Sequence, residues 1–164
     1  RLELEQEAAV VVLGSTKSGK SACLIGGDDE AHGSNESSPT TGLLPRFVRE
    51  IFDDAFGGEM TADAIELTMV QVVEEECVDL LKPSMSKSKR QLDLRWSTSC
   101  GAFVQDVSYS LCRSPAEALE LLNEGLAVRA VYLHQHGHST FHQSSHLVIT
   151  LTILQLDEDG GGGG

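Results

Sequence analysis

A short apolar run followed by a glycine-rich loop constrains the fold of this chain more than any other feature. Residues 8–13 are apolar and largely β-branched, which predicts a buried strand. Residues 22–25 can continue as the first turns of a helix. Between them the chain fits the pattern G-x-x-x-x-G-K-[S/T] at every fixed position. The matching residues are Gly14, Ser15, Thr16, Lys17, Ser18, Gly19, Lys20 and Ser21. A strand, a glycine loop and a helix in this order predict a phosphate-binding loop.

The residue types in this loop suit phosphate chemistry. Glycines allow backbone N–H groups to close around phosphate oxygens, and the N-terminus of the following helix adds a positive dipole. We expect Lys20 to reach the β- and γ-phosphates of a nucleotide, and Ser21 to place its hydroxyl on Mg²⁺. The alternative is a chance loop rich in glycine and serine. The predicted strand and helix on either side argue against that alternative.

Length and composition exclude several classes of protein. At 164 residues the chain is one domain or part of one, and 40% hydrophobic residues are enough for a core. A net charge of −13 argues against non-specific nucleic-acid binding, which requires a basic surface. No apolar run approaches the ~20 residues of a membrane span, and no signal-peptide pattern opens the chain. The four cysteines are widely spaced, which favours reduced thiols in the cytosol over a disulfide framework or a cysteine zinc site.

The two ends of the chain suggest a piece of a longer protein. It opens at Arg1 without a methionine, and residues 157–164 are acidic and then glycine-rich, with no core to join. We therefore expect a folded part over residues 1–156 and a flexible tail over residues 157–164.

Periodicity and turn residues predict the remaining elements. Residues 43–56 carry an apolar stripe typical of a helix, which Gly57 and Gly58 would end. A capping box over residues 114–117 opens a second helix, which we expect to end near Gly125. Strands are predicted for residues 60–73, 92–95, 102–107 and 147–156, and an acidic turn or short helix for residues 74–81. The fold class is α/β, with a central mixed sheet flanked by helices.

Two polar stretches carry alternative interpretations. Residues 26–41 are rich in Gly, Ser, Asn and Asp, so they form either a solvated insertion, which the composition favours, or a loop beside the ligand. Residues 74–76 are three consecutive glutamates, which suggest acid/base chemistry only if a partner motif accompanies them. The sequence holds no such motif, so a solvated turn is the better interpretation of the glutamates.

Five segments, in their order and spacing, resemble the N-terminal half of a kinesin motor domain. They are residues 10–21 with the phosphate loop, residues 42–52 (G-[I/L]-[I/L]-P-R…I-F), residues 65–81 (closing on a form of Y-N-E-x-[I/V]-x-D-L-L), residues 92–129 (L-x-[I/L]-R…G-x-x-V…S-x-x-E-x-x-x-L-L-x-x-G-x-x-x-R), and residues 144–146 with the strand after them (the end of switch I). The resemblance implies a P-loop NTPase fold, ATP and Mg²⁺ as ligands, microtubules or tubulin as partner, and a cytoplasmic, cytoskeletal location. The net charge predicts no nucleic-acid partner, and the absence of a long apolar run predicts no membrane partner.

The chain departs from the kinesin pattern in the segments that act on the γ-phosphate. Lys17 stands where the family has glycine. The switch I pattern N-x-x-S-S-R-S-H is broken, because counting from Arg129 or from His146 places its serine pair differently. Neither register supplies the asparagine or the arginine of the family. The hydroxyls left as candidate catalytic groups are those of Ser139, Thr140, Ser144 and Ser145.

These departures are similar to those of the atypical, non-motile kinesins. Phosphoryl transfer depends on positioning and charge stabilisation, so the resemblance implies a domain that binds ATP and hydrolyses it weakly or not at all. Its role would be microtubule binding or cytoskeletal signalling. One alternative is an active microtubule motor with a divergent switch I, in which case the protein is a P-loop ATPase. Another is an unrelated P-loop kinase or small NTPase, against which the segments beyond the loop argue.

Five histidines late in the chain raise the alternative of a metal site. They are His134, His136, His138, His142 and His146. Spacings of two and of four place several of them on one face of a strand or of a helix, and imidazole suits zinc or nickel. No carboxylate or cysteine lies within the cluster. A solvated loop in the place of switch I is therefore the better interpretation.

Overall fold

The computed structural model describes residues 8–15, 18–26, 41–53, 63–73, 76–82, 92–99, 101–135 and 145–154. The chain divides into two compact units, which are considered separately below. One unit comprises residues 1–64 and 153–164, and the other comprises residues 65–152.

The first unit contains two helices joined by a bridge. α1 covers Lys20–Leu24 and α2 covers Leu43–Phe52. An antiparallel β-bridge pairs Gly26 with Thr41, and the backbone at Gly42 passes so close to Ile25 that a Cβ atom there would collide with the carbonyl of Ile25. The apolar stripe predicted for α2 is present, with Val48 and Ile51 buried. The helix ends at Phe52 because Asp53 takes an extended conformation, and Gly57 and Gly58, the predicted stop, lie outside the described residues.

The run before the loop differs from its prediction. Residues 8–13 form no strand, and Val10, Val11 and Leu13 are 71%, 73% and 85% exposed. An apolar run of this kind becomes a buried strand only when neighbouring strands pair with it and layers cover both faces. No strand of the described part pairs with residues 8–13, so the local preference for strand is not realised.

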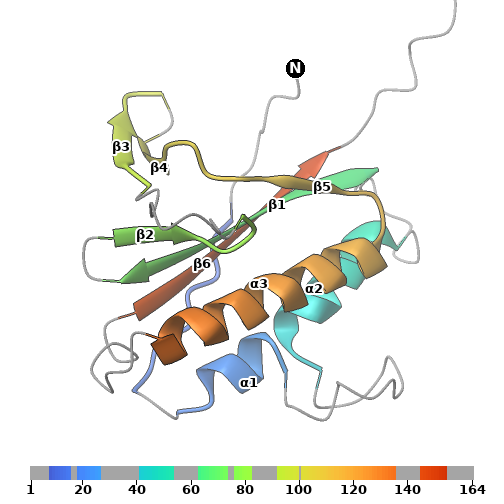
Figure 1. The fold of residues 1–164 in the computed structure, drawn as a ribbon. Coiled ribbons are helices and arrows are strands. Elements are labelled where there is room, and N and C mark those ends of the chain that lie inside the picture. Colours follow the sequence, from blue (N-terminus) through green and yellow to red (C-terminus); the bar gives the residue numbers. More distant parts are fainter. Residues whose placement is uncertain are drawn as a thin grey trace, which may run out of the picture. The chain divides into compact units, whose positions relative to one another are not determined.

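The second unit is built on a sheet centred on β1, which covers Ala64–Val73. The end of β1 pairs antiparallel with β2 (Glu76–Asp79), with Val72 opposite Cys77, and its beginning pairs antiparallel with β5 (Ser110–Cys112). β6 (Ser145–Leu154) also pairs with β1. The turn or helix predicted for residues 74–81 is wrong, because residues 76–79 form strand β2 (Figure 1). The ladder with β1 and the burial of Cys77 outweigh the acidic composition.

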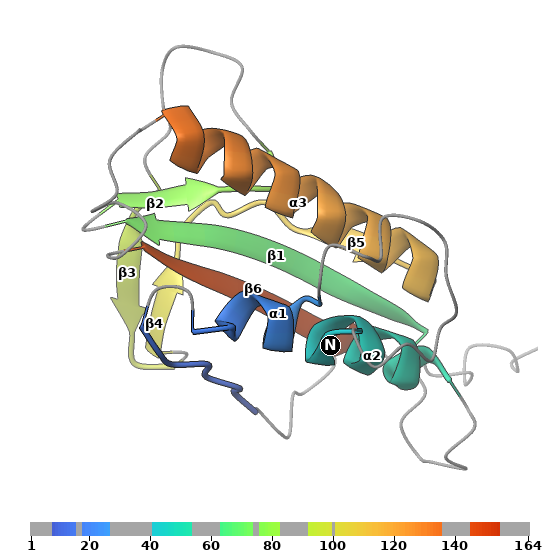
Figure 2. The ribbon, with the colours of Figure 1, turned by 90° about the horizontal axis from the view of Figure 1, so that it is seen from below.

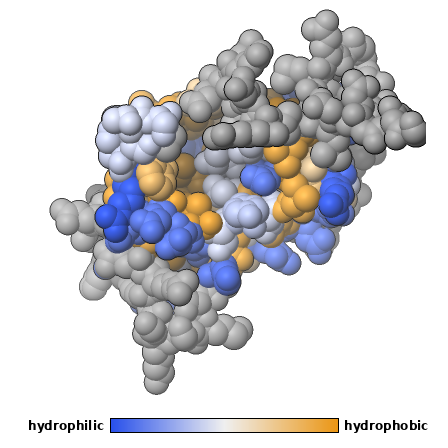
Figure 3. All heavy atoms as spheres, turned by 90° about the horizontal axis from the view of Figure 1, so that it is seen from above, coloured by the Kyte–Doolittle hydropathy of each residue, from blue (hydrophilic) through white to orange (hydrophobic). Residues whose placement is uncertain are grey.

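A two-stranded hairpin belongs to the same unit. β3 covers Leu94–Ser97 and β4 covers Gly101–Val104, so both predicted strands are present with shifted ends. Val104 packs against a small apolar cluster formed by Val70, Cys77 and Leu92. Other large apolar side chains of the hairpin are exposed, Trp96 by 76%. Figure 3 shows apolar and polar residues interspersed on the face that it views.

The long helix α3 covers Pro115–Gln135 and lies along β1 (Figures 1 and 2). The capping box is confirmed, since the Glu117 N–H donates to Ser114 Oγ and the Arg113 N–H donates to the Glu117 carboxylate. The predicted end near Gly125 is wrong, because α3 continues through this residue. A Cβ atom on Gly125 would lie 2.5 Å from Met69 Sδ, so the glycine serves the close approach of helix and sheet.

Alternation along β1 shows how the sheet is buried. Ile65, Leu67, Met69 and Gln71 share one face by their spacing of two, and all four side chains are fully buried. On the other face, Ala64 and Val70 are buried, and residues 66, 68 and 72 are half-buried. The α/β class predicted from the sequence is confirmed, with the sheet and α3 forming the core of this unit.

Candidate functional site

The glycine loop turns directly into α1, as predicted. The Ser18 N–H donates to the Ser15 carbonyl at 3.2 Å, which closes a turn within the loop. Gly19 has a left-handed backbone with φ of 86°, a conformation that glycine adopts without strain. The Cys23 N–H donates to the Gly19 carbonyl at 2.9 Å and begins the helix. Among the described residues, Ser18 and Gly19 therefore lead directly into the first turn of α1. Thr16 and Lys17 lie outside the described residues.

Gly14 is required by the packing of the loop on itself. A Cβ atom at this position would lie 2.5 Å from Ser18 Oγ. A larger residue would require the Ser18 side chain to shift. The first glycine of the motif thus has a steric reason in this structure, separate from any contact with a ligand.

The Lys20 side chain folds back over the loop. Its ammonium group donates hydrogen bonds to the carbonyl oxygens of Gly14 and Ser15, each at 2.6 Å. An ammonium group has three donors, so one remains for a further acceptor. Ser21, the next residue, is exposed at the start of α1. A positive charge, an exposed hydroxyl and the N–H groups of a helix start therefore lie within one short stretch of chain.

The predicted hydroxyls of switch I are only partly described. Ser145 is the first residue of β6 and belongs to the second unit, and its Oγ atom is buried without a hydrogen-bond partner among the described residues. Ser139, Thr140 and Ser144 lie outside the described residues. The structure thus brings the described phosphate-loop residues together and leaves the catalytic assignment of the four hydroxyls a prediction.

The histidines are spread over different elements where they are described. His134 lies near the end of α3 and His146 lies in β6, and both are exposed. His136, His138 and His142 lie outside the described residues. Within the described ranges, no group of three or more His, Cys, Asp or Glu side chains is arranged to hold a metal ion.

A partly buried polar pair in the second unit is not among the predicted site residues. Arg129 Nε donates to Gln71 Oε1 at 2.6 Å, and the Gln71 side chain is fully buried on the face of β1 that meets α3. Burial lowers the pKa of the Arg129 guanidinium. The sequence signal was a single glutamine within an apolar strand, and its partner lies 58 residues away.

A second polar contact joins the turn after β2 to the segment before β5. The Asp79 carboxylate accepts hydrogen bonds from the N–H groups of Leu81 and Lys82, and from the N–H of Ser108 at 2.8 Å. This carboxylate therefore fixes the path of the chain on both sides of the hairpin. Separately, in the part of the chain that the structure describes, no helix is both long and apolar enough to cross a membrane.

Comparisons with known proteins agree on one family. The family model described as the kinesin motor domain matches residues 4–162. Kinesin-like protein 3 of Schizosaccharomyces pombe is 26% identical over 161 residues, which are 98% of this chain and 27% of that protein. Kinesin-like protein KIN-1 of Oryza sativa subsp. japonica is 34% identical over 92 residues, which are 56% of this chain and 18% of that protein.

A solved structure supports the fold. The structure of a fast kinesin superposes with a TM-score of 0.65 at 22% identity, covering 84% of this chain and 36% of that chain. The P-loop NTPase fold predicted from the sequence is thereby confirmed. The chain spans only part of these two relatives, 27% of the S. pombe protein and 36% of the fast kinesin chain. From the match over nearly its whole length, the chain belongs to the kinesin motor domain family as a partial motor domain.

Proposed function

We propose that this chain is the nucleotide-binding part of a kinesin-like protein that binds Mg·ATP at residues 14–21 and turns it over weakly or not at all. It acts in microtubule binding or cytoskeletal signalling, at a cytoplasmic, cytoskeletal location. Membership of the kinesin family and the complete phosphate-loop pattern support this proposal. The observation that carries it is the Lys20 ammonium, which lies over the loop with one donor still available.

The backbone of the loop and the side chain of Lys20 would bind the phosphates in different ways. Backbone N–H groups of residues 14–19 and of the start of α1 donate hydrogen bonds to phosphate oxygens, with Gly14 and Gly19 giving the loop its close turn. Lys20 exchanges its contact with the loop carbonyls for the β- and γ-phosphates. The loop carbonyls are neutral acceptors, whereas the phosphates are anionic, so pairing the ammonium with an opposite charge favours the exchange.

Mg²⁺ fits the donors of this site. Magnesium prefers oxygen ligands and keeps several waters, and it is usually held by one or two protein oxygens together with substrate phosphates. Ser21 offers an exposed hydroxyl at the start of α1, next to Lys20. When bound, the ion supplies charge neutralisation on the phosphates. The protein's own contribution is the Ser21 oxygen as a single ligand.

The binding test uses calorimetric titration of Mg·ATP into a motor domain that contains this chain. Lys20→Ala should abolish detectable binding. Lys82→Ala removes the same group from an exposed position after β2 and should leave the affinity unchanged. Circular dichroism of all three proteins shows whether each remains folded. Equal affinity of the wild-type protein and Lys20→Ala would contradict the assignment of the site.

Weak turnover is proposed from the sequence of switch I. The segment lacks the asparagine and arginine of the family pattern, and Lys17 replaces a glycine beside the phosphates. Loss of such positioning slows catalysis by a factor of about ten for each ~1.4 kcal/mol of transition-state stabilisation. Ser139, Thr140, Ser144 and Ser145 retain hydroxyls for binding. Binding without efficient hydrolysis is the combination these residues favour.

Steady-state phosphate release at saturating microtubule concentration separates this proposal from an active motor. We expect turnover below the ordinary enzyme range of roughly 1–1000 per second. Turnover within that range would favour the alternative, an ATP-driven motor with a divergent switch I. Co-sedimentation with microtubules tests the partner independently of turnover, and its absence would favour a signalling role.

A further inference from the structure

The Lys20 side chain joins the end of the phosphate loop to its beginning. Lys20 is the first residue of α1, and its ammonium donates to the carbonyl oxygens of Gly14 and Ser15, each at 2.6 Å. A Cβ atom at Gly14 would lie 3.6 Å from Lys20 Cγ, which is ordinary van der Waals contact. The stem of the lysine therefore passes close to Gly14. We call the two contacts of the ammonium with the carbonyls of Gly14 and Ser15 the clasp.

One acceptor of the clasp also closes the turn of the loop. The Ser15 carbonyl accepts a hydrogen bond from the Ser18 N–H at 3.2 Å as well as one from Lys20. A carbonyl oxygen has two lone pairs, so these two donors use its full capacity. If Lys20 leaves the Ser15 carbonyl, that oxygen still has the Ser18 N–H as a donor. The Ser15 contact is therefore the half of the clasp that costs less to release.

The number of donors on the ammonium limits what Lys20 can hold. It has three N–H donors, and the clasp uses two of them. Contact with the β-phosphate of a nucleoside diphosphate needs one donor, which the third N–H can supply. Contact with both the β- and the γ-phosphate of a triphosphate needs two. Together with the two carbonyls, these phosphates make four acceptors for three donors, so at least one contact of the clasp must weaken.

We propose that a nucleoside diphosphate leaves the clasp closed and that a nucleoside triphosphate opens it at Ser15. This inference rests on the proposed function, because it requires nucleotide at residues 14–21. The carbonyls are neutral and the γ-phosphate is anionic, so the ammonium favours the phosphate when the two compete for one donor. The beginning of the loop then differs between the diphosphate-bound and the triphosphate-bound protein, and Lys20 acts as a positioning residue for the loop in addition to contacting phosphate.

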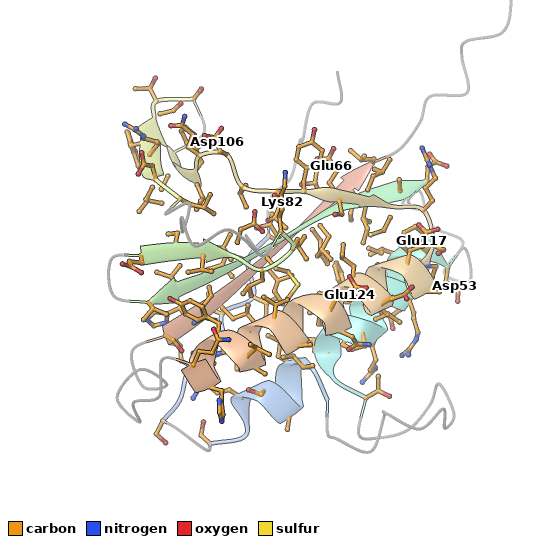
Figure 4. The ribbon with its side chains drawn as sticks, viewed as in Figure 1. Asp53, Glu66, Lys82, Asp106, Glu117 and Glu124 are labelled. Carbon is orange, nitrogen blue, oxygen red and sulfur yellow. The ribbon has the colours of Figure 1, made fainter. Side chains whose placement is uncertain are left out.

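The clasp itself is tested without added nucleotide, in a motor domain that contains this chain. Triple-resonance NMR measures the carbonyl ¹³C frequencies of Gly14 and Ser15, which rise when the oxygen accepts a hydrogen bond. Lys20→Met removes the donors and keeps most of the stem, so both frequencies should fall. Lys82→Met removes the same charged group from an exposed position in the second unit, labelled in Figure 4, and should leave both frequencies unchanged.

The opening of the clasp is tested on the wild-type domain alone, so it does not depend on the folding of a variant. The domain is saturated with Mg·ADP or with Mg²⁺ and a non-hydrolysable ATP analogue. The carbonyl ¹³C frequency of Ser15 should be lower with the analogue than with ADP. The Ala22 carbonyl accepts a hydrogen bond from the Gly26 N–H at 3.1 Å and is not part of the clasp. It is the internal control and should have the same frequency with both ligands.

Two outcomes would overturn the proposal. Unchanged frequencies of Gly14 and Ser15 in a folded Lys20→Met domain would mean that the clasp does not form in solution. Equal frequencies with ADP and the analogue at both carbonyls would mean that the γ-phosphate does not compete for the ammonium. Absence of calorimetric binding of either ligand would instead contradict the proposed function and, with it, the opening by a triphosphate. The comparison with Lys20→Met distinguishes that failure from absence of the clasp.

Discussion

At the scale of single residues, one hydrogen bond satisfies two polar side chains between β1 and α3. The pair of Arg129 and Gln71 places an amide and a guanidinium between β1 and α3. Removing one member leaves the other with an unsatisfied polar group, which costs about 1–3 kcal/mol. Replacing both by apolar groups of similar shape can be nearly neutral.

Arg129→Met should therefore lower the free energy of unfolding by about 1–3 kcal/mol, measured by urea denaturation. Combining it with Gln71→Met should restore much of the loss. Arg113→Met, at an exposed position before α3, is the control and should change stability little. Unchanged stability of Arg129→Met would mean that the hydrogen bond to Gln71 contributes nothing net.

The cysteines differ in burial and therefore in reactivity. Cys23 is exposed on α1, whereas Cys77 and Cys112 are buried in β2 and β5. Burial raises the pKa of the Cys77 thiol, and burial together with the charge of Glu117 raises the pKa of the Cys112 thiol. Since the thiolate is the reactive form, both buried thiols are protected twice, by access and by protonation.

Alkylation with iodoacetamide near neutral pH, followed by mass spectrometry of peptides, should modify Cys23 before Cys77 and Cys112. The raised pKa values also give the sign of a pH effect. The folded state holds these protons more tightly, so their contribution to stability is complete below the unfolded thiol pKa of about 8.5 and is lost as pH rises through the folded-state pKa. Stability that increases across this range in the wild-type chain and not in Cys112→Ala would contradict this assignment.

At the scale of elements, α3 shows a glycine whose role is packing rather than termination. Gly125 lies in mid-helix, where glycine costs roughly 0.8–1 kcal/mol relative to alanine. Glycine is nevertheless needed at this position, because Met69 occupies the space that a side chain would fill. Overpacking of a core costs typically 1–3 kcal/mol, which exceeds the helix propensity gained.

Gly125→Ala should therefore destabilise the protein, by about 1 kcal/mol after the gain in propensity is subtracted. Thermal denaturation measures the change. Asn123→Ala, at an exposed position of the same helix, adds propensity without a contact and should stabilise slightly. Met69→Ala in the Gly125→Ala background should cost less than Met69→Ala alone, and a purely additive result would show that the two residues do not interact.

At the scale of the whole molecule, the strand pairing of the second unit predicts that its amide hydrogens exchange most slowly with solvent. β1 has strand partners along its length, whereas no described strand pairs with residues 8–13. Hydrogen exchange followed by mass spectrometry should show slow amides in β1 and fast amides in residues 8–13. The exchange of α3 provides an internal reference for a packed helix. Protection of residues 8–13 equal to that of β1 would show that this run has a ladder partner within the chain.

Much of the fold follows from signals that act over a few residues. The starts of α1, α2 and α3 were predicted nearly correctly, because caps and helical spacing are local signals. The candidate site could be predicted for the same reason. Gly14 and residues 18–21 lie in one stretch of chain, and the structure needs no distant segment to bring Lys20 over the loop.

Only the tertiary structure decided the elements whose partners are far away in sequence. Residues 76–79 became strand β2 because β1 lies beside them, and α3 passed through Gly125 because Met69 approaches it. The pair of Arg129 and Gln71 joins residues 58 positions apart. For residues 8–13 the sequence determined the preference for a strand, but a strand also needs neighbours to satisfy its N–H and C=O groups. The preference of a segment for helix or strand depends on neighbouring residues. Strand pairing depends on segments that meet only in the folded chain.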